Sequence, residues 1–351
     1  MNFAFACEPE WESVLADELG RVFPGAVAQL IAEGWVTAEF EPAKLLTTPT
    51  VAFASQCLPD AAQIEADSIA KWAQTVGPRI IKALSEHTGP WRLHVFGVYK
   101  PQGAVGPRRA KLIENGIIEL LRNKQRRLLK SRTSGMDHFA DEEALVQVGL
   151  VTPTSGFLSV ALPEMLERLR RCVSPFPGGI VEVPPDRRAP SRAFAKLLEA
   201  EIRLGRRIEA GETCVDLGSS PGSWAYIALQ RGAKVVVAVD RSSLRADLMK
   251  HPSLEFVRGD AFRFEPTAQV DWLLCDVIAF PERVFELLKR WLTERWCRQF
   301  CVTIKFRGID DYAKLEPMKN WLAASGAEFF IRRLTSNKNE VTVAGSVSGE
   351  W

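Results

Sequence analysis

The sequence predicts an α/β protein whose C-terminal half is a mostly parallel sheet with helices on both faces. From residue 213 onward, short apolar runs of strand length alternate with helical stretches, a pattern typical of such sheets. Strands and helices also mix before this point, but without regular alternation, which indicates an α+β region. With 351 residues, the chain is long enough for about two domains, each with its own core.

A proline-rich segment separates the two parts. Between residues 174 and 190 the sequence has five prolines and the pair Gly178-Gly179, so neither a long helix nor a central strand can cross it. We therefore predict an N-terminal α+β region over residues 1–173, a linker over 174–190 and a second domain over 191–351.

The apolar patterns predict individual elements in both parts. In the N-terminal region, strands are expected at 35–40, 92–98, 145–151 and 157–161, and helices at 9–21, 63–86 and 108–130. In the second domain, strands are expected at 213–217, 234–239, 254–257, 272–275, 299–305, 328–334 and 340–347. Helices are expected at 191–202, from Pro221, near Leu244, from Pro281 and at 311–324.

Charge is unevenly distributed although the formal net charge is only +2. Residues 1–67 hold eleven acidic and two basic side chains, whereas residues 108–132 hold nine basic and two acidic ones. Such a basic segment is a candidate contact for RNA phosphates. It is equally compatible with the solvated face of an amphipathic helix, because apolar residues recur in it at helical spacing.

The composition excludes several classes of function. No stretch approaches the roughly 18 apolar residues of a membrane span, and the N-terminus lacks the basic flank of a signal peptide, so we expect a cytoplasmic protein with no membrane partner. Seven scattered cysteines form no C-x-x-C pair and four histidines complete no metal-ligand spacing, so we expect buried thiols and no metal. Chemistry must then use Lys, Asp and Glu.

A glycine-bearing loop follows the first strand of the second domain. The segment 216–224 has the spacing G-x-x-x-G, which differs from that of dinucleotide-binding loops and of P-loops. Asp240 and Asp260 close the next two strands, where a carboxylate can accept ribose hydroxyls. A single such Asp is more often a helix cap or a turn residue. Several of them together with the glycine loop favour a ligand site.

Four further charged residues occupy strand or helix positions in this domain. Asp276 and Lys305 each end an apolar strand, Glu340 begins the last strand, and Lys196 lies on the first helix. A Lys that finishes an apolar strand is unusual, because burying its charge is costly without partners. Taken singly, Lys196 is more simply a surface helix residue and Glu340 part of a strand-edge ion pair.

Five motifs follow one another through the second domain. They are S-R-x-x-x-K at 191–196, D-L-G-x-x-P-G-x-W at 216–224, C-D at 275–276, I-K-F at 304–306 and N-E-V-T-V at 339–343. In this order they resemble the FtsJ-type RNA ribose 2′-O-methyltransferases. The W-L-x-x-x-W-C-R stretch at 291–298 and the acidic-then-basic N-terminal region narrow the resemblance to bacterial methyltransferases of large-subunit ribosomal RNA.

This resemblance implies a Rossmann-like S-adenosylmethionine-dependent methyltransferase sheet, an N-terminal THUMP-like RNA-binding region and a cytidine of 23S ribosomal RNA as target. It implies a catalytic tetrad of Lys196, Asp276, Lys305 and Glu340. The implied S-adenosyl-L-methionine site comprises Ser191, Gly218, Ser220, Pro221, Gly222, Ser223, Trp224, Asp240, Asp260 and Asp276. At Ser223 the sequence departs from the family, in which many members have glycine.

Methyl transfer to a ribose hydroxyl requires that the hydroxyl lose its proton as the new bond forms. Lys305 can accept that proton only if its pKa falls from about 10.4, which burial and the ammonium of Lys196 favour and the two carboxylates oppose. The alternatives are methylation of a base nitrogen, of a small molecule or of another RNA, and an RNA-binding or ribosome-assembly protein with a relict methyltransferase fold. Methylation of a base nitrogen or of a small molecule would not require Lys305 and Glu340 together.

Overall fold

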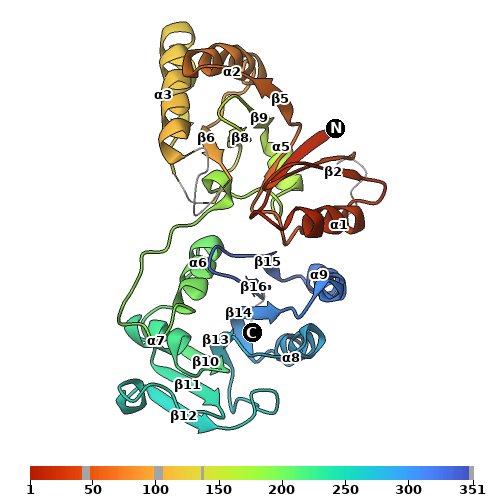
Figure 1. The fold of residues 1–351 in the computed structure, drawn as a ribbon. Helices are drawn as coiled ribbons and strands as arrows, with labels where there is room; N and C mark the ends of the chain where they lie inside the picture. The colour runs from red at the N-terminus through yellow and green to blue at the C-terminus, as the bar shows by residue number, and fades with distance from the viewer. Residues whose placement is uncertain (42–47, 99–105, 136–137, 348–351) are drawn as a thin grey trace. The chain divides into compact units, whose positions relative to one another are not determined.

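The computed structural model describes residues 1–41, 48–98, 106–135 and 138–347. The chain forms two compact units, Met1–Ile180 and Val181–Trp351, each with its own sheets and core (Figure 1). Among the described residues, no helix is long and apolar enough to cross a membrane.

The first unit begins with a small antiparallel sheet. Its strand order is β2-β3-β1-β4, formed by β1 (Asn2–Ala6), β2 (Val27–Ala32), β3 (Trp35–Glu39) and β4 (Gln56–Leu58), with α1 (Glu12–Val22) packed on it. Phe40 stacks between Phe3 and Phe23, with ring centroids 3.9 Å from each. The buried carboxylate of Glu18 accepts the main-chain N–H groups of Ala52 and Phe53, so its charge is hydrogen-bonded.

A five-stranded sheet makes up the rest of the first unit. The order β5-β9-β8-β6-β7 joins β5 (Ala62–Glu65), β6 (Trp91–Gly97), β7 (Arg132–Thr133), β8 (Ala144–Leu150) and β9 (Ser155–Ala161). Its helices are α2 (Ile69–Ala83), α3 (Pro107–Lys124), α4 (Arg126–Lys130) and α5 (Pro163–Arg168). The helix expected at 63–86 is therefore too long, because its first residues form β5 and Ser68 caps α2 by accepting the N–H of Lys71.

The second unit is built on one seven-stranded sheet of order β12-β11-β10-β13-β14-β16-β15. The strands are β10 (Thr213–Leu217), β11 (Val235–Asp240), β12 (Leu254–Arg258), β13 (Val270–Cys275), β14 (Cys297–Lys305), β15 (Glu328–Arg332) and β16 (Glu340–Ser346). Pairing is parallel from β12 to β14, and β16 pairs antiparallel with both β14 and β15. The predicted α/β fold with a mostly parallel sheet is confirmed.

Helices cover both faces of this sheet. Figure 1 shows α6 (Phe194–Leu204) and α7 (Ser223–Gln230) on one side, and α8 (Pro281–Thr293) and α9 (Leu315–Ala324) on the other. Short 3₁₀ turns lie at η2 (Pro177–Gly179), η3 (Leu248–Lys250) and η4 (Ile309–Lys314). The core includes the fully buried Trp272 and Trp291, and all seven cysteines, which lie in the described residues, are buried thiols.

Several expected helices of the second unit differ in the structure. The helix expected at 311–324 begins only at Leu315, after η4, and the helix expected from Pro221 begins at Ser223. The helix expected near Leu244 is wrong: between β11 and β12 the chain makes turns and the 3₁₀ segment η3, and Pro252 follows directly. The helix expected at 191–202 begins only at Phe194. Ser191 is tied to the glycine loop instead, with its Oγ 2.7 Å from the Oγ of Ser223.

Candidate active site

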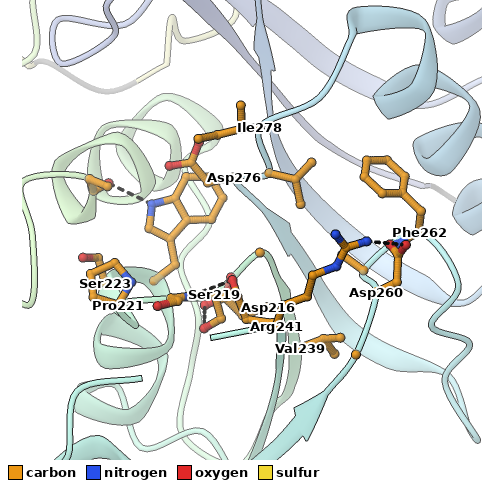
Figure 2. Close-up of a pocket in the computed structure, with 18 of the residues that line it drawn as sticks. Asp216, Ser219, Pro221, Ser223, Val239, Arg241, Asp260, Phe262, Asp276 and Ile278 are labelled. Atoms are coloured by element: carbon orange, nitrogen blue, oxygen red, sulfur yellow. Dashed lines mark hydrogen bonds and ion pairs between the residues drawn. The ribbon is translucent and has the colours of Figure 1, made fainter. Parts of the chain in front are cut away.

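A pocket of about 470 Å³ opens at the carboxyl edge of the seven-stranded sheet (Figure 2). Residues at or just after the ends of five neighbouring strands line it, namely Gly218, Asp240, Gly259, Asp276 and Lys305. Parallel strands bring their carboxyl ends to one edge, which is where ligands bind in sheets of this kind. The volume suits a small organic molecule.

The loop between β10 and α7 forms one wall of the pocket. Gly218 has φ +74° and Gly222 has φ +106°, conformations that side chains other than glycine rarely adopt. A Cβ at Gly218 would lie 2.6 Å from Cγ1 of Val277, and one at Gly222 would lie 2.6 Å from Cδ1 of Leu248. The two glycines therefore let the loop pack tightly against its protein neighbours, which fixes the wall.

Asp216, on β10, holds this loop by hydrogen bonds. Its Oδ2 accepts the Oγ–H of Ser219 at 2.5 Å and the main-chain N–H of Ala225 at 3.0 Å, and the side chain is buried. Burial raises the pKa of Asp216 to about 7, and the negative charges of Asp276 and Asp240 act in the same direction. Asp216 thus exchanges its proton near neutral pH.

Asp240 ends β11 at the middle of the pocket. Its Oδ2 accepts the main-chain N–H of Ser220 at 3.0 Å, and its Oδ1 accepts that of Ser242 at 2.8 Å. A carboxylate oxygen has two lone pairs, so each oxygen retains one for a ligand hydroxyl. The carboxylate is therefore both fixed by the protein and able to bind a diol.

Asp260 and Phe262 form one end of the pocket (Figure 2), and Arg283 also lines the pocket. The main-chain N–H of Phe262 and the guanidinium of Arg241 both donate to Asp260 and lower the pKa of its carboxyl. The guanidinium of Arg283 lies over the ring of Phe262, 3.8 Å from its centroid. This end offers an aromatic ring and an ionised carboxylate to a flat, hydrogen-bonding group.

The other end joins the glycine loop to the start of α6. The indole N–H of Trp224 donates to the main-chain oxygen of Ala193 at 2.8 Å, and Ser191 and Ser223 are hydrogen-bonded through their hydroxyls. All four residues line the pocket. These contacts fix the first turn of α6, and with it Lys196, relative to the loop.

Four charged side chains from four elements meet beside the pocket. Lys196 Nζ lies 3.1 Å from Oδ2 of Asp276 and 2.7 Å from Oε1 of Glu340. Lys305 Nζ lies 2.8 Å from Oδ1 of the same Asp276. Glu340 pairs in register with Lys305 across β14 and β16. The structure therefore brings the four predicted tetrad residues together, with Asp276 between the two lysines.

The two lysines have different surroundings. The Lys196 side chain is 9% exposed, whereas that of Lys305 is 23% exposed and lines the pocket. Burial lowers the pKa of Lys196, but the charges and hydrogen bonds of Asp276 and Glu340 outweigh burial and leave this pKa raised. Lys196 is thus a permanent cation that neutralises two carboxylates. Lys305 is the lysine that a bound molecule can reach.

Nine of the ten predicted cofactor residues line the pocket, and the exception is Gly222, which packs against Leu248 behind the loop. Sequence reasoning missed Phe262, Ile278 and Arg283, which also line it. Phe262 and Ile278 each lie two residues after a strand-end aspartate, so their position in the loops was the signal that could have identified them.

Comparison with known proteins gives consistent matches. Residues 189–295 match the family described as FtsJ-like methyltransferase. A protein named Ribosomal RNA large subunit methyltransferase M from Halorhodospira halophila is 34% identical over 209 residues, which are 57% of this chain and 60% of the relative. Its namesakes from Laribacter hongkongensis and Stutzerimonas stutzeri are 36% and 37% identical, each over 48% of this chain and 51% of the relative.

The chain thus spans between about half and three fifths of the length of these curated relatives. The matched segment contains three of the five motifs that carry the resemblance, at 191–196, 216–224 and 275–276, while the motifs at 304–306 and 339–343 lie beyond it. The resemblance predicted from the motifs is confirmed over residues 189–295, which match the family described as FtsJ-like methyltransferase.

Proposed function

We propose that this protein is an S-adenosylmethionine-dependent methyltransferase that modifies a ribose 2′-hydroxyl of 23S ribosomal RNA, at a cytidine, in the cytoplasm. The observation that carries the proposal is the contact of Lys196, Asp276, Lys305 and Glu340 beside the pocket. The names of the similar proteins, which specify large-subunit ribosomal RNA, support the substrate class.

The residues of the pocket fit S-adenosylmethionine, which supplies an electrophilic methyl group when bound. Asp240 would accept the ribose hydroxyls, since each of its oxygens retains a lone pair beside a main-chain donor. Asp260 and Phe262 would hold the adenine. Ser191 and the 220–223 turn, at the opposite end, would hold the methionine part.

Lys305 is the proposed base for the ribose hydroxyl. Its Nζ donates to Oδ1 of Asp276 at 2.8 Å and to the main-chain oxygen of Asp276 at 2.9 Å. A neutral amine has two N–H bonds and one lone pair, so these two acceptors match its two donors and leave the lone pair free for a proton. The proton would move from the ribose hydroxyl to Nζ as the methyl group is transferred.

Lys196 and Glu340 are proposed positioning residues. The buried ammonium of Lys196 is held by Glu340 and donates to both carboxylate oxygens of Asp276, at 3.3 and 3.1 Å. Asp276 in turn orients Lys305. The raised pKa of Lys196 fits this role, because an ammonium that keeps its proton cannot itself accept one.

We further propose that the first unit contains a THUMP-like RNA-binding region and that the basic segment 108–132 contacts phosphates. On α3 and α4, side chains such as Arg122, Lys124, Arg126 and Arg127 are exposed, while Ile113, Ile117 and Leu121 face the core. The amphipathic-helix and phosphate interpretations are thus compatible, since the buried face leaves the basic face available.

Mapping of ribose methylations on 23S ribosomal RNA from cells with and without the protein tests this function. We expect one ribose methylation to disappear with the protein and to return on complementation with the wild type but not with Lys305→Ala. An unchanged ribose pattern would contradict the proposal. Loss of a base methylation instead would favour the alternative of transfer to a nitrogen.

A further inference from the structure

Two large apolar side chains lie exposed in the loop that follows β13. Ile278 is 87% exposed, the largest exposure of any large hydrophobic side chain in the described part of the chain, and Phe280 is 48% exposed. Single exposed apolar residues are common, but two of them in the loop beside a pocket are a candidate contact for a bound molecule. Figure 2 shows Ile278 next to Asp276, and Ile278 lines the pocket itself.

Arg307 completes this surface from the neighbouring loop. Its guanidinium lies over the ring of Phe280, 4.0 Å from the centroid, and its side chain is exposed. Arg307 comes two residues after Lys305, just as Ile278 comes two residues after Asp276. Because β13 and β14 are adjacent parallel strands, their following loops lie at the same edge of the sheet as the tetrad.

The three side chains offer a specific combination of chemistry. Ile278 and Phe280 give an apolar and aromatic surface, on which a nucleobase can stack whatever its sequence identity. Arg307 adds a guanidinium, which binds phosphate through paired N–H donors while it stacks on the aromatic ring. A nucleotide can make both contacts at once, since its ribose links the base to the phosphate.

We propose that Ile278 and Phe280 hold the base of the acceptor nucleotide and that Arg307 binds its adjacent phosphate, so that these residues position the ribose for Lys305. This inference rests on the proposed function, since it names the part of the same site that receives RNA. The occupant is a nucleotide unit of single-stranded or unpaired RNA, because only an unstacked base can lie on this surface.

The test compares Phe280→Leu, Phe280→Tyr and Ile278→Ala with the control Ile202→Ala, an exposed isoleucine on α6 outside the pocket lining. Turnover is measured on an unmodified 23S ribosomal RNA transcript, and S-adenosylmethionine affinity by calorimetry. We expect Phe280→Leu to lower kcat/KM for the RNA roughly 5- to 140-fold, the range of one base–aromatic stack, without changing cofactor affinity. Phe280→Tyr keeps an aromatic ring and should have a kcat/KM close to that of the wild type. Ile202→Ala should have the kcat/KM of the wild type.

A second measurement couples the side chain to the base. The second substrate is an RNA fragment that spans the mapped target and carries an abasic ribose there. Removing the base should lower kcat/KM of the wild type by a factor similar to that of Phe280→Leu. For the Phe280→Leu variant, removing the base should lower kcat/KM little further. If the substitution and the removal of the base lowered kcat/KM by factors that multiply, the stacking contact would be contradicted. Turnover by Phe280→Leu equal to that of the wild type would contradict it as well.

The outcomes separate this inference from the proposed function. If the wild type methylates no ribose in the transcript, the proposed function fails before any variant is compared. If the wild type is active and the Ile278 and Phe280 variants weaken S-adenosylmethionine binding instead of RNA turnover, the surface belongs to the cofactor. The nucleotide assignment is then wrong while the proposed function remains.

Discussion

Lys305 Nζ donates to two oxygens of one residue, Oδ1 of Asp276 at 2.8 Å and the main-chain oxygen of Asp276 at 2.9 Å. The side-chain contact depends on the carboxylate, whereas the main-chain contact depends only on the position of the loop after β13. Substitutions of the carboxylate therefore leave one of the two contacts in place, so the charge of Asp276 can be tested without losing Lys305 from the pocket.

Lys305→Ala should abolish methyl transfer and keep S-adenosylmethionine affinity near that of the wild type. The reason is that Lys305 acts on the acceptor hydroxyl, while the glycine loop and Asp240 hold the donor. Lys305→Arg should also fail, because a guanidinium does not lose its proton to act as a base. Single-turnover transfer and calorimetry measure the two effects. Near-native turnover by Lys305→Arg would make Lys305 a positioning cation and Asp276 the candidate base.

Asp240→Ala should weaken S-adenosylmethionine binding by roughly 1–3 kcal/mol, the cost of leaving buried hydroxyls without an acceptor. The matched control is Asp247→Ala, which removes an exposed carboxylate paired with Arg245 in the same unit. Calorimetry gives both affinities, and thermal unfolding shows whether loss of the Ser220 and Ser242 contacts loosens the loop. Equal affinities for wild type and Asp240→Ala would remove Asp240 from the proposed cofactor site.

Charge reversal of Arg126 and Arg127 to Glu should weaken RNA binding and flatten its dependence on salt, because fewer counterions are released. The control is reversal of Lys71 and Lys82, two exposed lysines on α2 of the same unit. Filter binding over a range of salt concentrations gives the slopes. A slope unchanged by the Arg126 and Arg127 substitutions would leave the basic segment as a solvated helix face.

Asp216→Asn should remove a pH dependence of stability. In the native state the pKa of Asp216 is raised to about 7 from 3.8, so between these pH values the native state holds a proton that the unfolded chain releases. Wild-type stability therefore falls as pH rises through this window, by at most about 1.4 kcal/mol per pH unit. The free energy of unfolding of the variant minus that of the wild type, measured by urea unfolding, should therefore increase from pH 5 to pH 8. A difference that is independent of pH would show that Asp216 is ionised throughout.

Local patterns predicted the second unit well where strands are long and apolar. β10 was predicted at its observed bounds, and the alternation of strands and helices predicted the parallel core of the sheet. β1 and β4 were not predicted, because β4 has only three residues and becomes a strand through pairing with β1. The helix expected near Leu244 was wrong, because the chain forms turns and η3 there, and Leu244 lies close to Gly222, a contact that no local pattern contains.

The tetrad was predicted from motifs, but its geometry depends on strand order. Nothing local indicates that β16 lies between β14 and β15, which is what sets Glu340 opposite Lys305. Ile278 was missed for a different reason. A hydrophobic residue after a strand is normally expected to be buried, and its 87% exposure is a property of the folded loop.

The position of β16 in the sheet determines when, during synthesis of the chain, the site can be completed. A ribosome synthesises Lys196, Asp276 and Lys305 before Glu340, yet β16 inserts between two strands that precede it in the sequence. Until β16 is released from the ribosome, β14 has a free edge, and the ammonium of Lys196 lacks one of its two carboxylates. A nascent chain that has not yet formed β16 therefore has an incomplete tetrad, and the activity proposed here begins only after translation has passed Glu340.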